Sequence, residues 1–160
     1  MASDREEQAR QQFQEAFQAQ MSGDLDRAVE LYRASLELHP TAEAHTFLGW
    51  TYHFQGKVQE AIAECKLAIA VDPDFGNPYN DIGAYLIDLK RLDEAIPWLV
   101  QAMKAKRYEP RHFPYFNLGR IYVFKGHLNR ARELFQKALE IEPRYTAARR
   151  AIDQLRHMVN

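Results

Sequence analysis

The sequence predicts an all-α protein, a right-handed α-solenoid of about four helix–turn–helix units with a capping helix at the C-terminus. The first observation is an internal repeat: similar stretches align on Ala28, Ala61, Ala95 and Ala131, at spacings of 33, 34 and 36 residues. A repeat of this length is typical of stacked supersecondary units. The second observation is that apolar residues recur at helical spacing, as over 58–71, and do not alternate as in a strand.

Each unit is expected to hold two helices joined by a tight turn. The short breaks in the middle of the units fall at 23–24, 55–57, 90–91 and 125–127. The longer breaks between units fall at 39–40, 72–74, 108–114 and 142–144. Gly56 and Gly126 suit the left-handed residue that closes a helix. Pro40, Pro73 and Pro143 prevent another helical turn, because proline lacks the N–H that the turn needs.

The composition is that of one ordinary globular domain. The chain has 160 residues, of which 46% are apolar and 27% charged. No apolar run is long enough to cross a membrane, and the polar N-terminus lacks the apolar segment of a secretory signal. We therefore expect a cytoplasmic protein without membrane insertion. The one cysteine, Cys65, excludes an internal disulfide and does not favour a cysteine-based zinc site.

The net charge is −1, but the charged residues are unevenly distributed along the chain. Residues 1–80 hold 6 Lys and Arg against 13 Asp and Glu, whereas residues 81–160 hold 15 against 9. In an elongated stack this asymmetry could steer a charged partner or favour head-to-tail self-association. It is also compatible with an ordinary solvated surface.

The repeat resembles the tetratricopeptide repeat family. The residues that carry the resemblance in the second unit are Leu48, Gly49, Tyr52, Ala61, Ala68 and Pro73, and in the fourth unit Leu118, Gly119, Tyr122, Ala131, Phe135, Ala138 and Pro143. The small residues would let the two helices of a unit cross closely, with each alanine opposite a glycine. The resemblance implies a small stand-alone member with one domain over 1–160. Its repeats would cover about 9–41, 42–75, 76–111 and 112–145, followed by a cap helix over 146–159.

In this family the first helix of each unit lines a concave groove where partners usually bind. The resemblance therefore implies a partner-binding groove that includes Phe17, Trp50, His53, Phe54, Asn80, Phe116, Asn117 and Arg120. Aromatic rings would supply buried area, and Arg and Asn would supply direction. The alternative is that several of these rings pack between adjacent helices, and that Asp81 or Asp88 pairs with Arg120 without any ligand.

The function that this pattern predicts is that of a protein-interaction scaffold or adaptor, which binds a peptide or partner segment in an aromatic-rich groove. The alternative is a self-assembling protein whose groove or N-terminal helix forms a homo-oligomer. A clamp of two cations, as in family members that hold chaperone C-terminal carboxylates, is not expected at the matching places. Glu109, Glu140 and Glu142 interrupt the basic residues of the second half, so the sequence does not favour a nucleic-acid partner.

Catalysis, metal binding and a cofactor are not expected. The six histidines include no pair three or four residues apart, no phosphate-binding loop is present, and the carboxylates are scattered over helix surfaces. The segment from Lys104 to Pro114 carries two extra residues and two prolines. It is expected to widen the gap between the third and fourth units, either as a tolerated loop or as a second contact point.

Overall fold

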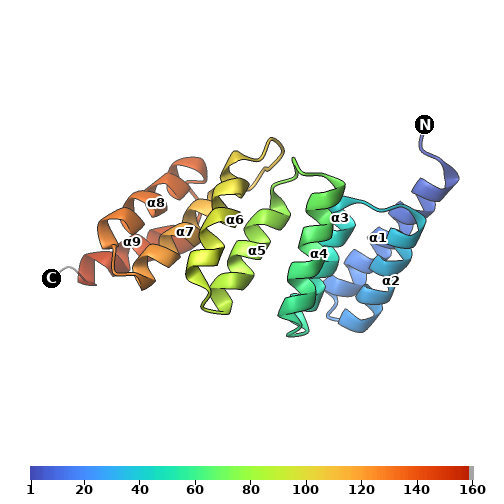
Figure 1. Ribbon diagram of the computed structural model, residues 1–160, viewed down its shortest axis with the longest axis horizontal. Coiled ribbons are helices and arrows are strands. Elements are labelled where there is room, and N and C mark those ends of the chain that lie inside the picture. Colours follow the sequence, from blue (N-terminus) through green and yellow to red (C-terminus); the bar gives the residue numbers. More distant parts are fainter. Residues whose placement is uncertain (159–160) are drawn as a thin grey trace.

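The computed structural model describes residues 1–158, and all regular secondary structure within them is helical. The helices are α1 (Asp4–Met21), α2 (Leu25–Leu38), α3 (Ala42–Phe54), α4 (Val58–Val71), α5 (Asn77–Asp88), α6 (Leu92–Lys104), α7 (His112–Phe124), α8 (Leu128–Ile141) and α9 (Thr146–Met158). They follow one another along a single elongated row, with the two termini at opposite ends (Figure 1). The prediction of an all-α solenoid is confirmed.

The helices pack in consecutive pairs that match the repeat read from the sequence. The closest packing joins α1 to α2, α3 to α4, α5 to α6 and α7 to α8, and α9 packs on α8. The first helix begins at Asp4, ahead of the first expected repeat. The expected cap helix corresponds to α9, and its last expected residue, 159, lies outside the described residues.

The turn inside each pair is closed by one residue in the left-handed conformation. Gly23, Gly56 and Gly126 have φ angles of 85°, 78° and 79°. Lys90 holds the same place in the third pair with a φ of 61°. A residue with a Cβ is strained there by about 1 kcal/mol. The third turn therefore keeps the geometry of the others although it lacks glycine.

Glycine lets the two helices of a pair approach closely, and in the second pair the expected alanine lies opposite it: a Cβ built on Gly49 would lie 3.0 Å from the main-chain oxygen of Ala61. In the third and fourth pairs a larger residue lies over the glycine. A Cβ built on Gly119 would lie 2.5 Å from Cε1 of Phe135, and one built on Gly83 would meet the side chain of Leu99. Each of these large residues follows the repeat alanine by one helical turn. Ala131 and the equivalent alanines are fully buried, yet the side chain that fills the space over Gly83 or Gly119 belongs to the residue four positions after the alanine.

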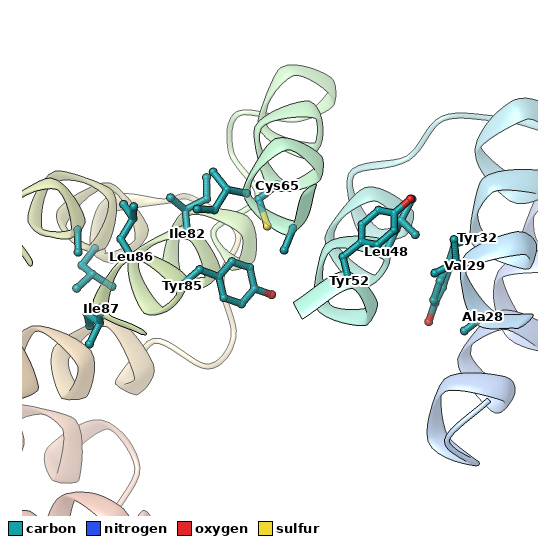
Figure 2. Packing of buried hydrophobic residues seen from close by; sticks show 14 of the residues in the cluster. Ala28, Val29, Tyr32, Leu48, Tyr52, Cys65, Ile82, Tyr85, Leu86 and Ile87 are labelled. Carbon is teal, nitrogen blue, oxygen red and sulfur yellow. The ribbon is translucent and has the colours of Figure 1, made fainter. Parts of the chain in front are cut away.

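The buried apolar residues form clusters that each join several helices of the stack. Tyr32, Leu48, Ile82, Leu99 and other buried residues of α1 to α7 form one cluster, and a second cluster joins α8 and α9. Figure 2 shows side chains of the first cluster projecting from neighbouring helices toward one another. Each pair thus buries its apolar stripe against the next, which is what a solenoid requires for stability.

The segment between α6 and α7 folds back on the connection between α4 and α5. Main-chain hydrogen bonds join Arg107 N to Asp74 O and Gly76 N to Arg107 O, both at 3.0 Å. The Arg107 guanidinium pairs with Asp72 and Glu43. The buried Tyr108 ring lies over Gly76, where a Cβ would be 2.5 Å away. The segment is therefore fastened to the preceding repeat, a structural role that the sequence did not indicate.

Arg111 secures the other end of this segment. Its guanidinium donates hydrogen bonds to the main-chain oxygens of Met103 at 3.1 Å and Ala105 at 2.6 Å. The last carbonyls of a helix have no partner within the helix. Arg111 supplies such a partner at the end of α6 while the chain turns into α7.

Candidate functional site

The first helices of the pairs form the inner side of the stack. Successive first helices, α1 with α3, α3 with α5 and α5 with α7, contact one another more extensively than successive second helices do. A stack whose first helices approach closely while its second helices fan apart curves toward the first helices. The candidate site is this concave face, and all eight residues predicted for it come from α1, α3, α5 and α7.

At its N-terminal end the face carries a chain of aromatic rings from α1 and α3, which we call the aromatic cluster: Phe13, Phe17, Phe47, Trp50 and Phe54. Neighbouring rings meet with centroids 5.1–6.0 Å apart, mostly edge to face. Phe17 is 38% exposed and Phe54 55% exposed, whereas the other three rings are half-buried. The aromatic cluster thus combines rings that pack between helices with rings that are exposed to solvent.

The middle of the face is polar and acidic. His53 Nε2 lies 3.2 Å from Asp88 Oδ2, and the His53 ring stacks on Tyr85 with centroids 4.6 Å apart. The Tyr85 ring projects from α5 toward α3 and α4 (Figure 2), and its hydroxyl is buried without a hydrogen-bond partner in the described structure. Burial raises the pKa of the nearby Asp81 to about 7.

The two predicted asparagines meet beneath the face and leave little surface to a ligand. Asn117 Nδ2 donates to Asn80 Oδ1 at 3.0 Å, and each residue is 7% exposed. Arg120 in turn donates to Asn117 Oδ1 at 3.2 Å. The alternative ion pairing of Arg120 with Asp81 or Asp88 is absent among the described residues, where Asp88 is instead paired with His53.

At the C-terminal end α7 and α9 enclose a recess of about 390 Å³, which we call the C-terminal hollow. It is lined by Phe116, Arg120, Val123, Phe124, Phe135, Ala147, Arg150, Ala151, Gln154, Leu155 and Met158. The predicted residues Phe116 and Arg120 therefore lie together here. Phe116 packs its ring against Phe135 and Tyr145, with centroids 5.4 and 5.1 Å away.

The contribution of α9 to this hollow was missed by the sequence prediction, which gave that helix only a capping role. A signal was present: Arg150, Gln154 and Met158 each follow by 34 residues Phe116, Arg120 and Phe124 of α7. The repeat period thus gives α9 the position of a first helix in a further unit. Its inner side continues the concave face.

Metal-binding side chains do not cluster in the described part of the chain. Within residues 1–158 no three His, Cys, Asp or Glu side chains come close enough to hold a metal ion. Cys65 is fully buried, and burial raises the pKa of its thiol well above the usual value. None of the helices over the same residues has the length and apolar character needed to cross a membrane.

Comparison with known families and curated proteins shows what the chain is similar to. Two family models, both described as tetratricopeptide repeat, match residues 19–78 and 74–143. The human protein O-mannosyl-transferase TMTC2 is 34% identical over 100 residues, which is 60% of this chain and 12% of that protein. The type IV pilus assembly protein PilF of Pseudomonas aeruginosa is 28% identical over 74% of this chain and 48% of its own length. The chain thus spans less than half of either relative.

Solved structures show the same fold. The structure of Pseudomonas aeruginosa PilF matches with a TM-score of 0.90 at 24% identity, over 98% of this chain and 71% of that chain. The structure of YrrB, described as a tetratricopeptide repeat protein with an unusual peptide-binding site, matches with a TM-score of 0.68 at 23% identity, over 90% and 74%. At these identities the likeness concerns the fold alone.

Proposed function

The chain belongs to the tetratricopeptide repeat family, and from this premise we propose that it is a protein-interaction scaffold whose concave face binds a segment of a partner polypeptide. The observation that supports this most is the set of aromatic rings left open to solvent on that face. Phe17, Phe54, Phe113 and Phe124 are all exposed, and all lie on first helices. The proposal concerns binding and assigns no catalytic step.

Exposed rings at these positions are favourable contact points for a polypeptide. A phenylalanine ring that becomes buried contributes about 1–2 kcal/mol through its apolar area, and more when it meets another ring edge to face. The rings are held by packed helices, so little conformational entropy is lost when a partner binds. Aromatic residues, phenylalanine included, are enriched in the core of protein interfaces.

The test compares rings on the two sides of the stack. Phe54→Ala and Phe124→Ala remove exposed rings from the concave face, and Leu67→Ala removes a side chain of α4 that is 48% exposed on a second helix. A partner identified by affinity capture and mass spectrometry is purified, and its affinity is measured by calorimetry. The two Phe variants should bind at least about tenfold more weakly, and Leu67→Ala should bind normally.

The same experiment can contradict the proposal. If both Phe variants keep normal affinity while circular dichroism shows an intact fold, the concave face is not the binding surface. A larger loss for Leu67→Ala would move the site to the second helices. Either result would leave the family assignment intact and remove the proposed site.

Self-association is the second candidate, and the uneven charge of the two halves of the chain favours it. Opposite charge at the two ends of an elongated stack attracts one copy head-to-tail to the next, and salt weakens this attraction. Sedimentation velocity at several protein concentrations and two salt concentrations tests it. A monomer at every concentration in low salt would exclude self-association as the principal role.

A further inference from the structure

We infer that the C-terminal hollow binds an acidic polypeptide segment that also carries a large apolar side chain. This inference rests on the proposed function and narrows the chemistry of the partner. It comes from two cations, Arg120 and Arg150, which line the same apolar recess from α7 and α9. Of these two cations, the sequence prediction placed only Arg120 in the groove.

The two guanidinium groups have no carboxylate partner. Among the described residues neither Arg120 nor Arg150 takes part in an ion pair, and the hydrogen bond of Arg120 goes to a neutral amide oxygen of Asn117. Some other cations of the chain do have such a partner, for example Arg107 with Asp72 and Lys125 with Asp93. Arginine forms its strongest hydrogen bonds with carboxylates, which it can hold through two parallel N–H groups.

A third cation lies at the edge of the hollow. The Lys90 ammonium, carried by the tight turn after α5, sits 4.5 Å from the centroid of the Phe124 ring. It too forms no ion pair in the described structure. The field around the recess is therefore positive on more than one side, and a segment with negative side chains would be attracted to it.

The recess also has room for an apolar side chain. Phe124 is 55% exposed and Met158 is 58% exposed, so both offer apolar surface that is still in contact with water. Two of the residues that α9 contributes to the same recess are the alanines Ala147 and Ala151, and their small size leaves space open. A large apolar side chain of the partner would fill this space and cover the exposed rim.

A nucleic acid has negative charge as well, but the neighbouring part of the face does not suit it. Asp88, whose side chain is 48% exposed, stands on α5, the next first helix along the concave face. A strand with a phosphate at every nucleotide would be repelled there, whereas a polypeptide can place its acidic residues at the hollow alone. The observations therefore favour a polypeptide.

The test uses short labelled peptides and the full chain. The probe has a central phenylalanine flanked by glutamates, and two further peptides replace either the glutamates by lysines or the phenylalanine by serine. Binding is followed by fluorescence anisotropy in about 50 mM and about 300 mM NaCl. The acidic probe should bind, more weakly at high salt, and both altered peptides should bind at least about tenfold more weakly.

The variants are matched in charge and position. Arg120→Gln and Arg150→Gln should each weaken binding of the acidic probe by about tenfold. Arg156→Gln removes the same charge from α9, at a residue 72% exposed beside Asp153 and outside the hollow, and should change binding less than about twofold. Thermal denaturation of each variant shows whether the fold is kept.

Three outcomes would overturn the inference. They are equal losses for Arg150→Gln and Arg156→Gln, equal binding of the acidic and basic peptides, and tighter binding of a single-stranded oligonucleotide than of the acidic probe. The proposed function fails separately. Suppose that Phe54→Ala weakens binding of the captured partner, while Arg120→Gln and Arg150→Gln leave binding of the acidic probe unchanged. The concave face then binds a partner, but the hollow does not recognise acidic residues.

Discussion

The hydrogen bond between Asn80 and Asn117 offers the sharpest test of how the concave face is built. Asn117→Ala removes the Nδ2 donor that lies 3.0 Å from Asn80 Oδ1, in a place where both residues are 7% exposed. The variant loses the hydrogen bond and leaves a nearly buried acceptor without a partner. Together these effects lower the free energy of unfolding by about 1–3 kcal/mol.

A double-mutant cycle separates the bond from the side chains. Asn80→Ala alone leaves the Asn117 Nδ2 donor unpaired and should also cost about 1–3 kcal/mol. In the double variant neither member of the bond is orphaned, and the loss of the Arg120 hydrogen bond to Asn117 is common to it and to Asn117→Ala. Its cost should therefore fall short of the sum of the single costs by about 1–2 kcal/mol. Urea unfolding, followed by circular dichroism of the helices, gives the three values. Asn129→Ala, an exposed asparagine of α8, is the matched control and should stay within about 0.5 kcal/mol of the natural chain.

The reasoning would be refuted by additive single costs, or by an Asn117→Ala variant as stable as Asn129→Ala. Either result would mean that water already satisfies the two amides and that the bond between α5 and α7 does not support the fold. The asparagines would then be free to face a ligand, as the family resemblance implies. Destabilisation with strong coupling would instead assign them to the support beneath the face.

Two further predictions concern the repeat and the groove. Gly119→Ala should lower the free energy of unfolding by about 1–3 kcal/mol, because its Cβ would lie 2.5 Å from the Phe135 ring; in a Phe135→Leu background the loss measured by urea unfolding should shrink, and an unchanged loss would disprove the contact. Burial raises the pKa of Asp81 to about 7, so the folded chain keeps a proton that the unfolded chain has released, and stability should fall as pH rises from about 4 to about 7. Asp81→Asn should remove this decline and stabilise the chain by about 1–3 kcal/mol at pH 8 but not at pH 4, and an equal effect at both pH values would contradict the assigned cause.

Much of the fold could be predicted because the repeated residues indicate the local geometry of each helix pair. Gly56 and Gly126 mark turns with a positive φ, and Ala61 and Ala131 mark fully buried positions. Such requirements depend on neighbours within one helix pair, which the spacing of a single sequence displays. The same spacing places the aromatic residues on first helices.

The remainder depends on contacts between repeats that the pattern does not encode. Asn80 and Asn117 occupy first-helix positions of the kind that face a groove, yet they bond to each other and each is only 7% exposed. Arg107 stands where the family pattern has proline, and its partners Asp72 and Glu43 lie 35 and 64 residues earlier in the chain. Only the three-dimensional packing brings these groups together.

The order of charges along the concave face matters more for partner choice than the net charge of −1. From the N-terminus the face presents the uncharged aromatic cluster, then Asp88, and then Arg120 and Arg150. A segment that crosses the whole face in one direction would meet opposite charges, whereas the reversed segment would place its acidic end beside the Asp88 carboxylate. If the proposed function holds, the charge order therefore sets the direction in which the partner lies, while the exposed rings supply most of the affinity.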